Sequence, residues 1–457
     1  MKKALLVCLC LCAGISMAFG GGASETSSST SPEAAKKTVV RFWTIDRHDA
    51  AFWQPKFDEY NATNTDNIEA KYEIYSDNYI AAVDMAFQTG EAPDMIKLDM
   101  GFYNKYLNQG KFADLFPFMD DETKSMVQPV LFKGYNYIDG KCYYVPTGNT
   151  CFRLFYNKAI FDRLGLKVPT TLDEMVQCAK TITEKLGGEG IYGFACNLKS
   201  PTSGLKRSFE PMCELSEDLD MGFDFSSGKY DFAKMEPVVE GWKELMKYAF
   251  PGCESLDIDP LRTQFAAGKI GMYISYTHAE PGVYATQFPM ADGQDWGCAY
   301  IPVLNGKYKG KSNFSATPAF LMNADGKNKE AAWKAYKAVL LNTANLKQHY
   351  EQGYGIGLLP AVIEGAVPGK KYQENPALLK SENDTLWPLT PTEQYPQGII
   401  IEGLSYYDTI ASLIAGQGDI GKGLTDLSNR YNTAYQKAIK QGLATDLTIP
   451  GFTSKDL

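Results

Sequence analysis

Motifs that mark several enzyme classes are missing from this chain of 457 residues. It contains no HExxH metal site, no GxSxG nucleophile turn and no phosphate-binding P-loop. Its only three histidines, His48, His278 and His349, stand at no metal-ligand spacing from one another. Carboxylates are abundant, but abundance alone does not identify a glycosidase pair. We therefore predict a protein that is not an enzyme and that holds no metal and no cofactor.

A block of basic residues is also missing. Lysine and arginine number 45 against 54 aspartate and glutamate, which gives a formal net charge of −9 at pH 7. An acidic surface without a basic run argues against binding to nucleic acid and to anionic membranes. Beyond the N-terminus, no apolar run has the length that a membrane-spanning helix needs. Small molecules and other proteins are left as the expected partners.

The CxxC motif and other metal-like cysteine spacings are absent from the chain. Three of the ten cysteines lie in the apolar N-terminus, and seven follow it. An odd number leaves at least one free thiol, and we interpret most of the seven as small buried side chains. A disulfide such as Cys142–Cys151 or Cys213–Cys253 is an alternative that the sequence does not decide.

The first residues have the pattern of an export signal. Lys2 and Lys3 precede an apolar stretch at residues 4–17, and small residues follow at Ala18 and Gly20. We predict cleavage after Gly20, so that residues 1–20 form a signal peptide and the mature protein is exported to the periplasm. Lipidation at Cys12, which would tether the chain to the membrane, is the alternative. By composition, the Ser-rich residues 21–37 are a disordered linker.

Strand and helix patterns alternate along the rest of the chain. Apolar strand patterns at residues 38–44 and 68–75 are each followed by a helical pattern, at residues 50–61 and 79–89, and a short buried strand follows at residues 95–98. This alternation favours right-handed crossovers and an α/β layer fold. With 44% hydrophobic residues, the chain has ordinary globular composition and the length of two or three domains.

The most specific stretch is residues 143–183, YYVPTGNTCFRLFYNKAIFDRLGLKVPTTLDEMVQCAKTIT. The pattern predicts an extended run, a short helix that ends at Gly165, and a second helix. Thr171 and Glu174 have the spacing of a capping box at the start of that second helix. The string P…LFYNK…F…GL…P.T.DE…A..IT resembles the segment that crosses between domains in bacterial extracellular solute-binding proteins, whose sugar-binding members feed ABC importers.

Three shorter strings resemble the same family in the same order. They are GEAPD at residues 90–94, which resembles G.APD, FAAGKIGMYI at residues 265–274, which resembles F..GK.AM.I, and a G..P turn in residues 355–361. The resemblance implies an α/β, two-lobed fold of the periplasmic-binding-protein type II. Each lobe would be a mostly parallel sheet with flanking helices, and the ligand cleft would lie between the lobes.

The resemblance also implies a division of the chain and a function. The first lobe would comprise residues 38–148 plus 317–390, and the second lobe residues 149–316 plus 391–457. The protein would capture a sugar or oligosaccharide by lobe closure and deliver it to the permease subunits of an ABC transporter. It would act as a monomer and make or break no bond.

Sugar binding would use aromatic faces together with charged and amide groups, because sugars present C–H faces and hydroxyls. The family places such contacts after the first and third strands and at the first crossing between lobes. A tryptophan that the family often has at the end of the third strand is replaced by Leu98. Asp46 has an alternative to a ligand contact, namely a cap at the N-terminus of the following helix. The implied contacts here are Trp43, Asp46, Arg47, Asp99, Phe102, Tyr103, Asn149 and Thr150.

The second half of the chain supplies the remaining implied contacts. Many relatives have a stacking tryptophan near the position of His278. The histidine in place of that tryptophan argues against a long maltodextrin-like ligand. The implied contacts are Asn197, Ser200, Thr202, Tyr276, His278, Tyr354, Tyr395 and Glu402.

Three alternatives to a sugar importer stay open. The same fold could bind another polar solute: a polyamine through Asp46, Asp99 and Glu402, ferric iron through the adjacent Tyr406 and Tyr407, or a phosphorylated compound. A secreted carbohydrate-active enzyme would need two converging carboxylates, one with a strongly raised pKa. A module that signals instead of transporting is the third alternative.

Overall fold

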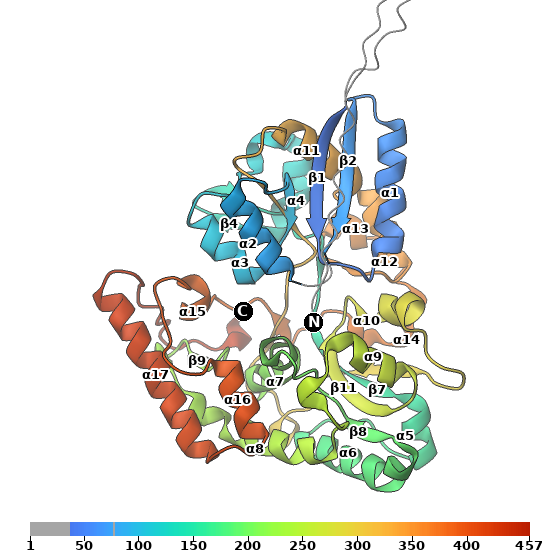
Figure 1. Ribbon diagram of the computed structural model, residues 1–457, viewed down its shortest axis with the longest axis vertical. Coiled ribbons are helices and arrows are strands. Elements are labelled where there is room, and N and C mark those ends of the chain that lie inside the picture. The colour runs from blue at the N-terminus through green and yellow to red at the C-terminus, as the bar shows by residue number, and fades with distance from the viewer. Residues whose placement is uncertain (1–36, 76–77) are drawn as a thin grey trace, which may run out of the picture. The chain divides into compact units, whose positions relative to one another are not determined.

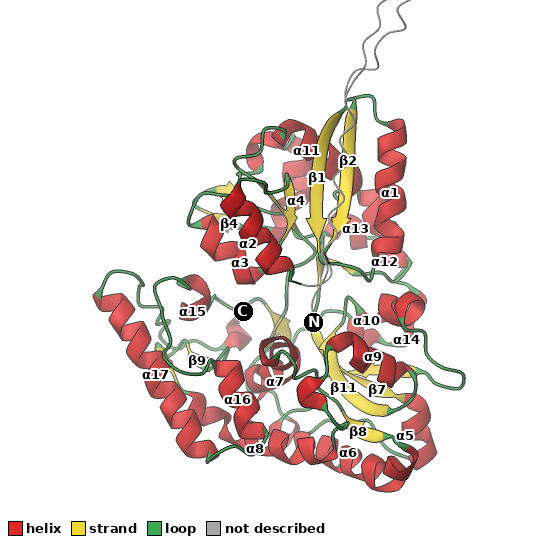
Figure 2. Ribbon diagram, in the orientation of Figure 1, coloured by secondary structure: helices red, strands yellow, loops and turns green. Residues whose placement is uncertain are grey.

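The computed structural model describes residues 37–75 and 78–457 (Figure 1). The predicted signal peptide, residues 1–20, and all but Lys37 of the predicted linker lie outside the described residues. Strands and helices alternate along the chain and form two four-stranded sheets, each packed with its own helices (Figure 2). We call these two units the first and the second lobe. Within the described ranges, no helix combines the length and the apolar character needed to cross a bilayer.

The sheet of the first lobe has the strand order β14-β3-β1-β2. Strand β1 (Thr38–Thr44) pairs in parallel with β2 (Ile68–Ile74) and β3 (Met95–Lys97), while β14 (Phe320–Met322) pairs antiparallel with β3. The edge strand β2 buries alternate residues because only one of its faces meets the core. The strands predicted from the apolar pattern are therefore confirmed.

Helices of the first lobe cover this sheet with apolar stripes. Trp53 and Phe57 of α1, for example, are 2% and 0% exposed and pack with Phe42 and Tyr72 of the strands. The helices are α1 (Ala50–Thr63), α2 (Tyr79–Thr89), α3 (Met100–Leu107), α4 (Asp121–Val127), α11 (Lys329–Val339), α12 (Thr343–Glu351) and α13 (Pro360–Ile363). A small hairpin joins β4 (Tyr137–Ile138) to β5 (Lys141–Cys142).

The sheet of the second lobe has the order β12-β7-β11-β8 and corrects one prediction. Strand β7 (Phe152–Asn157) is antiparallel to both β11 (Ile270–Tyr276) and β12 (Trp296–Ala299), and only β11 and β8 (Tyr192–Phe194) are parallel. The expectation of a mostly parallel sheet is therefore wrong for this lobe. The physical reason is that β7 enters directly from the crossing segment and starts where β11 ends, with Phe152 opposite Tyr276.

Helices of the second lobe begin and end at the predicted signals. Thr171 and Glu174 form the capping box of α6, and Gly165 ends α5 with a left-handed φ of 62°. The helices are α5 (Lys158–Leu164), α6 (Leu172–Leu186), α7 (Pro201–Glu217), α8 (Glu236–Leu245), α9 (Ile258–Ala266), α10 (Glu280–Gly282), α14 (Lys370–Glu374), α15 (Pro391–Gln394), α16 (Tyr406–Ile414) and α17 (Ile420–Lys440). A hairpin pairs β9 (Phe223–Asp224) with β10 (Lys229–Tyr230).

Segments that connect the lobes meet at Gly148. Strand β6 (Gly148–Asn149) pairs with β15 (Ile356–Gly357), and Thr150 bridges to Ser315. A Cβ atom on Gly148 would lie 2.7 Å from the Ile356 carbonyl oxygen and 3.0 Å from that of Thr317. Only glycine leaves room for three backbones at this point. Residues 315–317 form one of these segments.

The return of the chain to the second lobe comes earlier than predicted. Tyr372 and Leu378 pack with Phe155 and Trp296, and Trp387 lies in the core around α6 and α7. Strand β16 (Asp384–Thr385) pairs with β13 (Ser312–Asn313). Residues 370–390 therefore belong with the second lobe and not with the first. The loop-like composition of this stretch concealed the few large apolar side chains that attach it.

The seven cysteines of the described residues are free thiols. Six are buried and Cys298 is partly buried. Burial raises the pKa of Cys142, Cys151 and Cys196 to about 12 each. They act as small apolar side chains, as the sequence analysis favoured, and neither alternative disulfide is formed.

Candidate functional site

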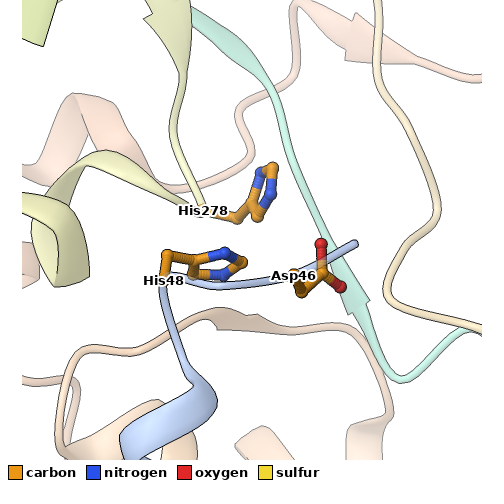
Figure 3. A group of neighbouring side chains, drawn as sticks. All are labelled: Asp46, His48 and His278. Carbon is orange, nitrogen blue, oxygen red and sulfur yellow. The ribbon is translucent and has the colours of Figure 1, made fainter. Parts of the chain in front are cut away.

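Two loops from different lobes meet beside the crossing segments. The loop after β1 carries Asp46 and His48, and the loop after β11 carries His278. The rings of His48 and His278 lie 5.0 Å apart at 77°, with the Asp46 carboxylate beside them (Figure 3). Arg47 extends from the first loop to α9 of the second lobe, where it forms an ion pair of 2.8 Å with Asp259. Carboxyl ends of strands are where α/β proteins bind ligands.

A cavity of about 20 Å³ lies under these loops. All three histidines of the chain line it, together with Asp46 and Asp49. The crossing segments close it through Gly148, Thr317, Pro318, Ile356 and Gly357. The volume suits one water-sized occupant. Residues that are distant in sequence thus converge at one small cavity where the two lobes join.

Asp46 at the cavity forms an ion pair with a buried lysine. Its Oδ2 lies 3.0 Å from Nζ of Lys97, which is 6% exposed at the end of β3. Burial alone would raise the pKa of Asp46, but the neighbouring groups, chiefly Lys97, together outweigh burial and lower the pKa to about 2. Asp49, and not Asp46, precedes α1, so the helix-cap alternative does not apply to Asp46.

Two buried polar atoms at the cavity have no hydrogen-bond partner among the described residues: Asp49 Oδ1 and His278 Nδ1. The other oxygen of Asp49 accepts from Trp53 Nε1 at 2.9 Å and lies 3.1 Å from His349 Nε2. Burial lowers the pKa of His278 well below its ordinary value, so this ring is neutral at pH 7. An unpaired buried group costs about 1–3 kcal/mol, so both atoms favour an occupant that can pair with them.

Next to the cavity, cationic side chains of α7 lie close to the aromatic ring of Tyr276 in the second lobe. The Arg207 guanidinium lies 4.9 Å above the Tyr276 ring, and its Nη2 donates to Ser203 Oγ at 2.8 Å. Burial lowers the pKa of Arg207. For its neighbour Lys206, burial would lower the pKa, but the charges of Glu393 and Glu210 outweigh it and raise the pKa. Both side chains come from α7, which begins at a serine cap, Ser200.

Three carboxylates of the second lobe are also buried together. One oxygen from each of Glu210, Glu214 and Asp220 lies within 4.8 Å of the others. Glu210 accepts a hydrogen bond from the Tyr407 hydroxyl, and Glu214 accepts one from Asn313 N at 2.7 Å. Burial raises the pKa of all three, and that of Glu210 reaches about 7.

The raised pKa of Glu210 predicts a pH-dependent stability. Between its ordinary value near 4.5 and about 7, the folded protein keeps a proton that the unfolded chain has released. The contribution of Glu210 to stability is therefore full below pH 4.5 and is lost as the pH rises to about 7. At about 1.4 kcal/mol per pH unit, this loss is on the order of 3 kcal/mol. We expect Glu210→Gln to lose less stability than wild type between pH 5 and pH 7 in urea unfolding. Parallel stability curves for the two proteins would contradict the assignment.

The structure brings some of the predicted ligand contacts together. Asp46, His278 and Tyr354 line the cavity, and Arg47 and Tyr276 adjoin it. Asn149 ends the crossing strand β6, and Thr150 follows it. Asn149 and Thr150 are 3% and 1% exposed, and Asn149 donates to the Gly357 carbonyl oxygen. Their side chains thus support the crossing segments directly.

Other predicted contacts lie elsewhere. In the first lobe, Phe102 and Tyr103 are 1% and 0% exposed within an aromatic core, Trp43 packs on Tyr75, and Asp99 caps α3. In the second lobe, Asn197, Ser200 and Thr202 surround the start of α7. Tyr395 bonds Thr445 at 2.6 Å, and Glu402 is exposed before α16. Their roles in ligand binding stay predictions.

Sequence reasoning missed several side chains of this region: His48, Lys97, Lys206, Arg207 and His349. His48 stands two residues from Asp46, so the same loop could have indicated it. The other four lie on elements that reach this region only in the folded protein, and no local sequence pattern indicates that they do. His349 in particular reaches the cavity from α12, 300 residues along the chain from its partner Asp49.

Comparison with known proteins identifies the family. Residues 44–345, more than half of the chain, match the sequence profile of the bacterial extracellular solute-binding proteins. This chain belongs to that family. The binding protein BAB2_0491 of Brucella abortus (strain 2308) is 27% identical over 232 residues, which cover 50% of this chain and 54% of the relative. The chain thus spans about half the length of the curated relatives it matches.

Solved structures with a similar fold align with most of this chain. One comes from a study of xylan utilization by Caldanaerobius polysaccharolyticus, with a TM-score of 0.70, 19% identity, and 86% of this chain and 100% of that one covered. Another is the GacH receptor of Streptomyces glaucescens, solved unliganded and with acarbose, with a TM-score of 0.69, 18% identity, and coverage of 88% and 99%. The fold is the type II fold of periplasmic solute-binding proteins, as predicted.

Proposed function

We propose that this solute-binding protein captures a sugar or oligosaccharide outside the cytoplasm and delivers it to the permease subunits of an ABC transporter. One observation carries the proposal: polar side chains of both lobes, Asp46 and His48 from one and His278 from the other, meet beside the aromatic ring of Tyr276. Carboxylate and imidazole groups suit hydroxyls, and an aromatic ring suits the C–H face of a sugar. One similar structure comes from a study of xylan utilization and another was solved with acarbose, and both support this substrate class.

Lobe closure around the sugar would be the transport signal. Polar contacts already join the lobes away from the cavity: Asn104 Nδ2 donates to the Glu393 carbonyl oxygen at 2.6 Å, and the Tyr135 hydroxyl donates to that of Trp387. A ligand that touches both lobes only when they are closed shifts the protein toward that state. We propose that the exported monomer presents this closed state to the permease and makes or breaks no bond.

A thermal-shift screen of the chain without its predicted signal peptide tests the proposal. The ligands are mono- and oligosaccharides, polyamines and ferric salts. A sugar at about 100 times its Kd should add about 2.7 kcal/mol of stability and raise the melting temperature. Incubation of the active sugar, followed by chromatography, should return it unchanged, because we propose binding without turnover.

A matched pair of carboxylate variants locates the site. Asp46→Asn should abolish the sugar-dependent shift, because this carboxylate lies where the loops of the two lobes meet. Glu240→Gln removes an exposed carboxylate of α8 in the second lobe, at a position with no implied ligand contact, and should preserve the shift. A polyamine or iron response without any sugar response would refute the substrate class and leave the fold unaffected. Hydrolysis of the sugar would instead favour the enzyme alternative.

A further inference from the structure

We propose that Asp46, His48 and His278 form a binding site for one divalent transition-metal ion of the Zn²⁺ and Co²⁺ type, shared between the two lobes. Each residue offers one ligand atom, and these three atoms lie within 4.8 Å of one another (Figure 3). The histidine spacing in the sequence predicts no metal, so this inference departs from the sequence and goes beyond the proposed sugar transport.

The donor set suits this class of metal. Imidazole nitrogens and one carboxylate oxygen are common ligands of Zn²⁺ and Co²⁺, and three protein ligands leave a fourth position for water. Bonds of about 2.0–2.1 Å place tetrahedral ligand atoms about 3.4 Å apart. The ligand atoms therefore need to approach one another by at most about 1.4 Å, and all three residues stand on loops just beyond strand ends.

The unpartnered atoms of the cavity give independent support. Asp49 is 2% exposed and its Oδ1 has no partner among the described residues, and the same holds for His278 Nδ1. A metal ion would pair with the histidine nitrogen, and a water bound to the ion could donate to the aspartate oxygen. Asp49 Oδ2 also lies 3.9 Å from His48 Nε2, and a carboxylate behind a ligating histidine orients the ring and raises its basicity.

The surrounding charges admit a cation. Asp46 and Asp49 face the cavity with two negative charges, against the single positive charge of Lys97 on Asp46. Arg262, which also lies near His278, is neutralised by Glu280 at 2.9 Å. The net charge around the three ligands is therefore negative. Lys97 opposes a metal, and its removal should strengthen binding.

Titration of the chain without its predicted signal peptide with Co²⁺, followed by visible absorption, tests the proposal. Co²⁺ bound by histidine and carboxylate gives weak d–d bands without the near-ultraviolet charge-transfer band that a thiolate ligand adds, so the spectrum separates this site from the seven free cysteines. We expect one saturable equivalent and a raised melting temperature.

Four variants localise the ion. His48→Phe and His278→Phe keep a ring but lose the ligand, and each should weaken Co²⁺ binding at least tenfold. His349→Gln changes the third histidine of the same cavity and should alter the affinity less than threefold. Lys97→Met should increase the affinity several-fold, and a misfolded variant would not produce such a gain.

The outcomes separate this inference from the proposed function. No saturable binding up to millimolar Co²⁺, a thiolate spectrum, or equal affinity in wild type, His48→Phe and His278→Phe would each overturn the metal site. The saccharide screen repeated with EDTA tests sugar binding alone, since sugar binding that survives EDTA supports the sugar proposal whatever the metal result.

Discussion

Replacing Arg153 with methionine should lower the free energy of unfolding by about 3–5 kcal/mol, because it leaves a buried carboxylate unpaired. Arg153 on β7 and Asp384 on β16 are 2% and 4% exposed. Two guanidinium nitrogens donate to the two carboxylate oxygens, at 2.9 and 2.5 Å. Arg153 Nε also donates to the Ala377 carbonyl oxygen at 2.6 Å. Urea unfolding at pH 7, followed by circular dichroism, measures the loss.

An exposed ion pair of the same chain is the control. Lys334 and Asp66 lie 2.5 Å apart, but their side chains are 53% and 43% exposed. Solvent screening makes such a pair worth less than about 1 kcal/mol, so Lys334→Met should have little effect. Equal losses from the two substitutions would show that the Arg153 pair does not hold residues 377–384 on the second sheet.

Gly193→Ala should destabilise the protein by about 1–3 kcal/mol or more, since no side chain can move aside to make room. Gly193 lies in β8, where α6 crosses the sheet. An added Cβ would fall 2.2 Å from both Cα and the carbonyl oxygen of Ala179, which are backbone atoms. The strand and the helix would have to separate. The midpoint of chemical unfolding and the melting temperature both report this loss.

Gly188→Ala provides the comparison in the same helix–strand unit. Gly188 is exposed, and a Cβ atom there would have no neighbour within 4 Å. Its substitution should be neutral or stabilise the protein by up to about 1 kcal/mol, because alanine restricts the unfolded chain. A Gly193→Ala protein as stable as Gly188→Ala would mean that α6 and β8 are not held as closely as described.

Local signals in the sequence identified most elements because their causes lie within a few residues. The capping box at Thr171 and the glycine that ends α5 both appear as predicted. Helix α17 begins directly after an aspartate cap, Asp419, although Gly421 and Gly423 lie in its first turns.

Contacts between distant segments could not be predicted in this way. Apolar runs look alike in parallel and antiparallel strands, so the direction of β7 followed only from the path of the chain between the lobes. The placement of residues 370–390 depended on three large side chains that fill the second core. Phe102 and Tyr103, predicted as ligand contacts from their loop, became core because α3 turns them inward.

The sequence by itself determined the family, the alternation of strands and helices, and the loops that adjoin the cleft, because these depend on local periodicity and on motif order. Only the tertiary structure decided which side chains meet there. His48, His278 and His349 are scattered along the chain, and the folding of two sheets around three crossing segments brings them to one cavity. Their proximity is a product of long-range packing, which no spacing within the sequence encodes.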